Sequence, residues 1–421
     1  MGSTARREGA YRCLSSLRVT LAGVIAPHVS ATVERARALG KVLVVSDTSE
    51  FKFSSERKGL GILNGQKKDG FLGHLSLAVS ADGRRTPLGA LGLETMVRSG
   101  RKGQRDNSTR KKDPSRESLR WGRCAEAASE LLGGVEAIHV MDREADIYEL
   151  LAGLMKNGRR FIIRNGQERS LDQGLLSTAV QAAVMRFSRE VKLSTRASAQ
   201  TPAKRRTHPA RQGRVANLSI ATTRVSLRKP NAAFEPGLPD SISVNLVRVW
   251  EMDCPPGEPP VEWRLFTTDP VDTQQQVEDI VDAYRARWVI EEYFKALKTG
   301  CNYEQSQLET FHSLENLLAI YVPIAWQLLA LRSAARDQPD RPARQILSST
   351  QIIALRLITQ GKAIPAEPTV RDVFSAIAEL GGHIKSNGSP GWQVLARGFD
   401  EVRRAESIYL RMISATSSDQ S

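Results

Sequence analysis

One segment of the chain, residues 284–298, combines a helical period with a concentrated set of polar side chains. Its sequence is YRARWVIEEYFKALK, with neither glycine nor proline. At about 100° per residue, Tyr284, Arg287, Glu291, Lys295 and Lys298 fall on one face roughly 80° wide. Apolar side chains cover the opposite face, which suits burial. The segment is therefore predicted to form a helix that presents one polar face.

Two interpretations of this polar face remain open. It can be a solvated surface with ion pairs between successive turns, such as Glu291 with Lys295. It can also be a functional face, because one carboxylate beside a tyrosine and three cations suits metal-dependent phosphoryl transfer on DNA. In that case Glu291 holds a metal ion, and the cations and the hydroxyl hold phosphates.

Two short apolar runs, residues 41–47 and 136–142, each end in an aspartate. Continuous apolar runs of this length predict buried strands, with Asp47 and Asp142 at their carboxyl ends. Taken singly, either aspartate can be only a cap or a turn residue. Together with Glu291 they can hold two divalent ions about 3.5–4 Å apart, which activate the attacking oxygen and stabilise the leaving one.

Oxygen ligands favour Mg²⁺, with Mn²⁺ as a substitute, and two ions are expected in each active site. Soft ligands are scarce: the four cysteines form no C-x-x-C pair and the six histidines are scattered, so zinc is disfavoured. His139, just before Asp142, is predicted to be a strand residue rather than a ligand.

The net charge of +14 favours a polyanionic partner, with DNA, RNA and an anionic membrane all possible on charge alone. Residues 195–230 contain no aspartate or glutamate, and residues 101–116 form a second basic loop. Such runs can be merely solvated, or they can contact phosphates. No apolar run appears long enough to span a membrane, and residues 17–31 are a poor signal peptide. A cytoplasmic protein without a membrane partner is therefore expected.

The three carboxylate elements together resemble a known family. Residues 284–298 contain Tyr-x2-Arg-x3-Glu-x6-Lys, preceded by a strand-Asp-Thr-Ser element at Asp47 and an Asp-Arg-Glu-Ala-Asp element at Asp142. This order resembles the YREK signature of DDE transposases of the insertion-sequence-four family, which includes the Tn-five transposase. The resemblance implies an α/β fold with an RNase H-like catalytic core, a β-rich insertion and a helical C-terminal region. It assigns catalysis and metal binding to Asp47, Asp142 and Glu291.

The resemblance also implies positions that hold DNA. Trp263 lies 21 residues before Tyr284, where the family has a tryptophan that stacks on a flipped base; the alternative is a core tryptophan. Arg164 matches an arginine that contacts the end DNA, unless it is only a surface residue at a strand end. Arg143 can reach phosphate or brace a carboxylate. The phosphate-contacting positions of the family helix correspond to Tyr284, Arg287, Lys295 and Lys298.

The expected organisation follows from these elements. Strands are predicted near residues 41–47, 74–80, 87–97, 136–142, 161–164, 214–227, 241–250 and 263–268, with helices near 117–132, 147–154 and 273–297. The expected domains are a partial N-terminal DNA-binding region (1–36), the first part of the core (37–164), the β-rich insertion (165–262), the second part of the core (263–310) and a helical dimerisation region (311–421).

The predicted function is a cut-and-paste DNA transposase that cleaves and joins strands of transposon-end DNA and target DNA. A homodimer is expected in the DNA complex, in the bacterial cytoplasm and associated with the nucleoid when bound to DNA. Residues 8–12 resemble a motif well inside the family's N-terminal domain, so part of that domain is expected to be missing. The alternative is therefore a truncated, inactive copy that binds DNA or partner transposase and inhibits transposition. A structure-directed nuclease with the same core is a third possibility.

Overall fold

A computed structural model describes residues 4–63, 69–98, 116–193, 195, 210–231, 233, 235–359 and 364–418. These residues form a mixed α/β structure with a large mixed sheet and a helical C-terminal region. The chain divides into two compact units. The first contains Met1–Asp106, Glu126–Glu136 and Trp288–Ser421, and the second contains Asn107–Ala125 and Ala137–Arg287.

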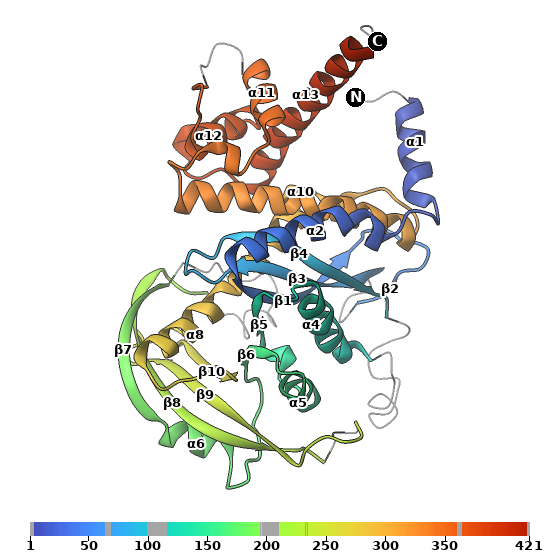
Figure 1. The fold of residues 1–421 in the computed structure, drawn as a ribbon. Helices are drawn as coiled ribbons and strands as arrows, with labels where there is room; N and C mark the ends of the chain where they lie inside the picture. Colours follow the sequence, from blue (N-terminus) through green and yellow to red (C-terminus); the bar gives the residue numbers. More distant parts are fainter. Residues whose placement is uncertain are drawn as a thin grey trace. The chain divides into compact units, whose positions relative to one another are not determined.

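The first unit contains a group of antiparallel strands and most of the helices (Figure 1). β1 pairs with one edge of β3, and β2 and β4 pair with different parts of the opposite edge. Its elements are α1 (Thr4–Ser15), α2 (Leu21–Leu39), β1 (Lys41–Lys52), β2 (Gly61–Ile62), β3 (Asp69–Ser80), β4 (Pro87–Met96), α9 (Trp288–Lys295), α10 (Phe311–Asp337), α11 (Ser349–Ile358), α12 (Val370–Leu380) and α13 (Trp392–Ser418). α4 (Arg120–Leu131) begins in the second unit and ends in the first.

β1 differs from the strand predicted from the sequence. It does not stop at Asp47 but continues to Lys52, and Asp47 lies opposite Leu75 within the antiparallel pair with β3. The predicted position of Asp47 at a strand end is therefore wrong. The reason is that β3 is also twelve residues long, so ladder hydrogen bonds continue past the apolar run.

α10 corrects a second expectation. By length and composition it is apolar enough to cross a membrane, which the sequence analysis had excluded for every run. Most of its apolar window is nevertheless buried inside the protein, and its polar side chains bond to neighbouring elements. Asn316 donates to the Leu14 carbonyl oxygen and Trp326 donates to that of Pro87. These contacts are those of a core helix.

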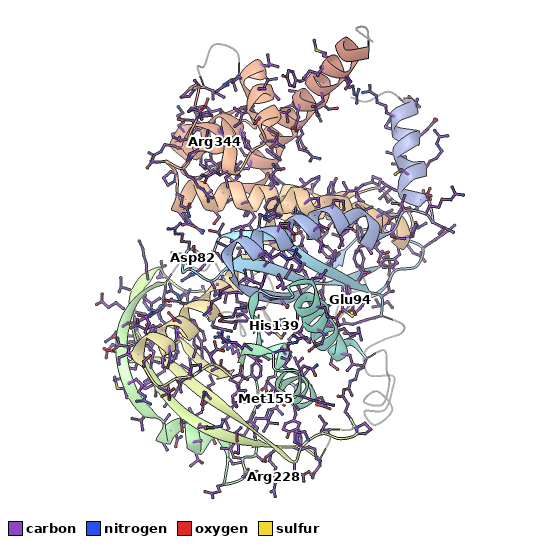
Figure 2. The ribbon with its side chains drawn as sticks, in the orientation of Figure 1. Asp82, Glu94, His139, Met155, Arg228 and Arg344 are labelled. Carbon is purple, nitrogen blue, oxygen red and sulfur yellow. The ribbon has the colours of Figure 1, made fainter. Side chains whose placement is uncertain are left out.

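The second unit contains the strand order β5-β6-β10-β9-β8-β7. β5 and β6 are parallel, and every later pair is antiparallel. Its elements are β5 (Glu136–Met141), α5 (Tyr148–Lys156), β6 (Arg160–Arg164), α6 (Leu176–Ala182), β7 (Val184–Leu193), β8 (Arg214–Arg228), β9 (Ser241–Glu251), β10 (Glu262–Thr267) and α8 (Gln274–Ala286). His139 is a buried residue of β5, as predicted (Figure 2).

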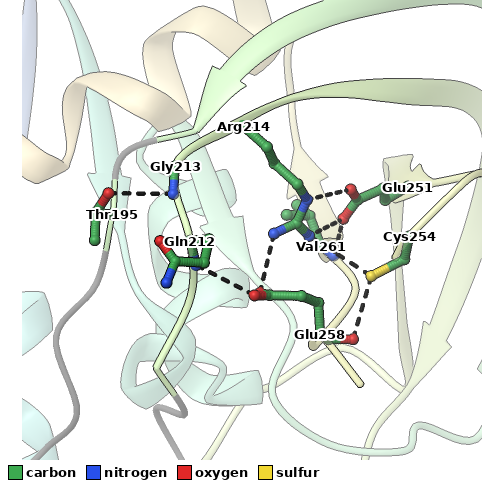
Figure 3. A network of polar contacts seen from close by, with 8 residues as sticks. All are labelled: Thr195, Gln212, Gly213, Arg214, Glu251, Cys254, Glu258 and Val261. Carbon is green, nitrogen blue, oxygen red and sulfur yellow. Dashed lines mark hydrogen bonds and ion pairs between the residues drawn. The ribbon is translucent and has the colours of Figure 1, made fainter. Parts of the chain in front are cut away.

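A polar network fastens the end of the β8–β9 pair (Figure 3). The Arg214 guanidinium makes two hydrogen bonds to the Glu251 carboxylate, at 3.0 and 2.9 Å, and a third to Glu258. Glu251 also accepts the backbone N–H of Val261 at 3.1 Å. Because the Glu251 side chain is almost fully buried, several donors are needed to offset its loss of water. The network thereby fixes the chain that leads into β10.

The predicted helix over residues 273–297 is interrupted. α8 ends at Ala286, α9 begins at Trp288, and a π-helical turn follows at Ala296–Gly300. The N–H of Cys301 donates to the Ala296 carbonyl oxygen at 2.9 Å, five residues back. A constant 100° per residue therefore does not describe this segment past Lys295.

Candidate active site

Asp142 follows the last residue of β5 and caps a short 3-10 helix. Its Oδ1 accepts the backbone N–H of Glu144 at 2.8 Å, which fixes the direction of the carboxylate. β5 and β6 are parallel, with Met141 opposite Ile163. Asp142 and Arg164 therefore emerge from adjacent strands at the same edge of the sheet, where polar groups of α/β folds gather.

A buried hub at Asp146 holds the loop behind Asp142. The Asp146 carboxylate accepts the Asn165 amide at 2.8 Å and the Gly166 N–H at 2.9 Å. It also pairs with the buried Arg169 guanidinium. A Cβ at Gly166 would lie 2.9 Å from the Cβ of Arg143, so glycine is required where this loop crosses the Asp-Arg-Glu-Ala-Asp run. Arg143 itself is exposed.

Trp263 lies at the start of β10, beside the same edge. β10 pairs with β6 so that Leu265 is opposite Arg164, and the Arg164 guanidinium donates to the Glu262 carbonyl oxygen at 3.2 Å. Trp263 is half-buried, and its ring centroid lies 5.5 Å from that of Tyr284 in an edge-on arrangement. The indole is thus supported on one side without being enclosed in the core.

Tyr284 connects α8 to this edge. Burial raises the pKa of its phenol, and Asp142 acts in the same direction. The nearby cations of Arg287 and Arg164 oppose this increase in the pKa. With the pKa raised overall, Tyr284 stays protonated at neutral pH and keeps a hydroxyl that can donate. The second unit therefore brings together Asp142, Arg164, Trp263, Tyr284 and Arg287.

α8 is held in place independently of these residues. Thr273 caps its first turn, with a reciprocal bond from Gln276. On its outer face, Asp282 pairs with Arg189 of β7 at 2.6 Å and with Arg285 at 2.9 Å. These cations hold the pKa of the Asp282 carboxyl below its usual value against the opposing effect of burial. The Asp282–Arg189 ion pair therefore links α8, which carries Tyr284, to β7.

Asp47 occupies the middle of β1 in the first unit. Its Oδ1 accepts the N–H of Thr48 at 2.7 Å, and the Thr48 hydroxyl lies 2.9 Å from Nδ1 of the buried His74. Residues 42–46 of β1 are buried, whereas Asp47 is half-exposed. Partial exposure begins at Asp47, and the strand returns to the core at Phe51.

Glu291 lies on α9, also in the first unit, and is half-exposed. α9 is anchored by Ile290, Tyr293 and Phe294, and the buried Tyr293 hydroxyl donates to the Val322 carbonyl oxygen at 2.9 Å. Lys295 is exposed and pairs with Glu292 at 2.8 Å. Lys298 lies in the π-helical turn, where its ammonium donates to the Glu50 carbonyl oxygen of β1.

The donor set fits a hard divalent cation. Asp47, Asp142 and Glu291 offer only carboxylate oxygens, which Mg²⁺ and Mn²⁺ prefer. Asp47 and Glu291 belong to the first unit and Asp142 to the second. Over the described ranges, no group of three or more histidine, cysteine, aspartate or glutamate side chains gathers as a ready metal site.

Sequence reasoning missed the residues that support these positions. Asp146 belongs to the Asp-Arg-Glu-Ala-Asp motif, but the sequence assigned it no role. No sequence pattern indicated that Arg169 would pair with Asp146 or that Glu304 would accept the N–H of Lys52. Part of the basic charge lies outside the described residues, namely most of residues 101–116 together with Arg196, Lys204, Arg205 and Arg206.

Part of the chain matches a known protein family. Residues 125–326 match the family model described as transposase DDE domain. The matched span includes Asp142 and Glu291, whereas Asp47 lies before it. Over this span the chain is similar to DDE transposases, and the match supports an enzyme that acts on DNA in transposition.

Proposed function

We propose that this protein is a DDE transposase of the insertion-sequence-four type that moves DNA by cutting and pasting. One observation carries the proposal: Asp142, Arg164, Tyr284 and Arg287 meet at one edge of the second unit beside a half-exposed indole. A carboxylate next to cations and a neutral hydroxyl suits a metal ion and a phosphodiester. The family match over the same segment supports it.

In this proposal Asp47, Asp142 and Glu291 hold two Mg²⁺ ions within an RNase H-like core. When bound, the ions supply Lewis acidity to the attacking and leaving oxygens. Arg164, Arg287 and Lys295 bind phosphate oxygens, and the Tyr284 hydroxyl donates to another. These side chains hold the scissile phosphate in line with the nucleophile, so that their contribution is positioning and charge stabilisation.

The proposed excision from the flanking DNA proceeds in two steps. Water attacks the phosphorus at the transposon 3′ end, and the P–O3′ bond breaks. The leaving oxygen takes up a proton to become a 3′-hydroxyl, while the water loses one to solvent. The 3′-hydroxyl then loses its proton and attacks a phosphorus of the opposite strand. A new P–O bond closes the hairpin, the P–O3′ bond to the flanking DNA breaks, and the leaving 3′ oxygen takes up a proton. The same proposal takes residues 165–262 as an insertion in the core and residues 311–421 as the region of dimer contacts.

The direct test is cleavage of a plasmid that carries the repeats flanking the gene. We expect nicks and hairpin-ended fragments with Mg²⁺ or Mn²⁺, and none with a chelator. Persistent cleavage in the chelator would contradict a metal-dependent site. Nicks without hairpins would favour a nuclease of the same fold.

Tyr284→Phe tests the phosphate contact. Losing one hydroxyl donor should weaken DNA binding roughly 2- to 12-fold, or about 0.5–1.5 kcal/mol. Fluorescence anisotropy with a labelled duplex measures it. Tyr148→Phe is the matched control, because its hydroxyl donates at 2.8 Å to the Pro239 carbonyl oxygen and not to this cluster. Equal DNA affinity in the two variants would show that the Tyr284 hydroxyl does not contact DNA.

A further inference from the structure

Lys298 connects the segment after Glu291 to strand β1. Besides its bond to the Glu50 carbonyl oxygen, its ammonium lies 5.1 Å from the Phe51 ring centroid and 3.7 Å from a carboxylate oxygen of Glu304. About a quarter of the Lys298 and Glu304 side chains remains exposed. The pair is therefore shielded more than an ordinary surface ion pair, whose contribution is small.

Glu304 contacts β1 as well as Lys298. The same oxygen accepts the backbone N–H of Lys52 at 2.8 Å, and the Lys52 ammonium lies 2.9 Å from the Glu50 carboxylate. Glu50, Lys52, Lys298 and Glu304 thus form one connected group within the first unit, named here the β1–α9 brace. It joins residues 252 positions apart in the sequence.

We propose that the β1–α9 brace positions two metal ligands relative to each other, with Glu304 and Lys298 as positioning residues. Asp47 precedes Lys52 on the same strand, and Glu291 lies two helical turns before Lys298. α9 packs beside β1, and the brace links β1 to the chain that continues directly from α9. Metal ligands need placement within about 0.5 Å, and residues behind them commonly set it.

The π-helical turn places the Lys298 ammonium against β1. π-turns inside helices are frequent at functional sites, and this one begins directly after α9. Lys295, in the regular part of α9, keeps its ammonium at the exposed surface. The two lysines therefore lie in different surroundings: Lys295 is exposed, whereas Lys298 contacts β1.

The inference rests on the proposed function, since it takes Asp47 and Glu291 as metal ligands. The test measures Mn²⁺ binding to the full chain by the electron paramagnetic resonance signal of free Mn²⁺. Glu304→Ala should weaken Mn²⁺ affinity roughly 10-fold. Glu304→Gln should lose less, because its side-chain oxygen still accepts the Lys52 N–H. Glu309→Ala, an exposed position five residues further on, should bind as the wild type does.

Hydrogen exchange gives a second readout that needs no metal. The Lys52 amide should exchange faster in Glu304→Ala and stay protected in Glu304→Gln. Wild-type Mn²⁺ affinity in Glu304→Ala would overturn the brace. So would a Lys298→Met variant that binds Mn²⁺ as tightly as the wild type. Unchanged Mn²⁺ binding in Asp47→Asn would instead defeat the proposed metal site itself.

Discussion

Asp47→Asn, Asp142→Asn and Glu291→Gln should each slow DNA cleavage at least about 1,000-fold, or roughly 4 kcal/mol of transition-state stabilisation. The reason is that an amide keeps the shape of each side chain but lacks the negative charge that the proposed metal ligands need to hold a hard cation. Each side chain is half-exposed, so the exchange should leave folding intact. Cleavage rates with Mg²⁺ and Mn²⁺, alongside a melting curve and DNA affinity, measure the three effects separately.

Glu292→Gln is the matched control for Glu291→Gln. Glu292 is the next residue on α9 and pairs with Lys295. Its loss should change cleavage less than about 2-fold, because exposed ion pairs contribute little. Wild-type cleavage by any of the three carboxylate variants would remove that residue from the metal ligands. A variant that is inactive but also unfolded or unable to bind DNA would count against a role limited to the metal.

Strands were predictable from the sequence where the pattern of apolar residues alone indicated them. The apolar run before Asp142 and the alternating residues of β8 and β9 formed strands where expected, because burial on one or both faces dictates their period. The break at Arg287 was not predictable, since every residue around it is compatible with a helix. The end of β1 was also missed, because its length depends on pairing with β3.

The support of the candidate site escaped sequence reasoning for a different reason. Asp146 with Arg169, and Lys52 with Glu304, are contacts between segments that the sequence does not link. The sequence around a charged residue does not indicate which distant residue will form an ion pair or hydrogen bond with it. Candidate catalytic and DNA-contacting residues can be proposed from a sequence motif. The residues that support them through hydrogen bonds and ion pairs can be identified only from the tertiary structure.

Trp263→Ala should impair hairpin formation roughly 5- to 150-fold while leaving the first nick nearly unchanged. The nick needs only water, metal ions and one phosphate. The hairpin requires the 3′-hydroxyl to reach the opposite strand, which bends that strand tightly. Flipping a base out relieves this crowding, and stacking on an indole stabilises the flipped state by about 1–3 kcal/mol. The effect appears in the rate only if stacking is stronger in the strained state.

The setting of Trp263 favours this role over that of a core residue. Its indole is half-buried, and Tyr284 supports one side of it. Val249 is its partner on β9, so the neighbouring Trp250 points to the opposite face of the sheet, where Arg248 stacks on it at 4.5 Å. Trp250→Ala is therefore the matched control: it removes an equal side chain from the same pair of strands without touching the candidate site.

Pre-nicked DNA isolates the hairpin step, and melting curves report stability. If Trp263 were only a packing residue, its alanine variant would lose about 3–5 kcal/mol of stability and fail at every step. A normally stable Trp263→Ala protein that slows nicking and hairpin formation equally would reject base stacking. The expected result is a hairpin defect in Trp263→Ala and not in Trp250→Ala, because the Trp263 indole lies beside Tyr284.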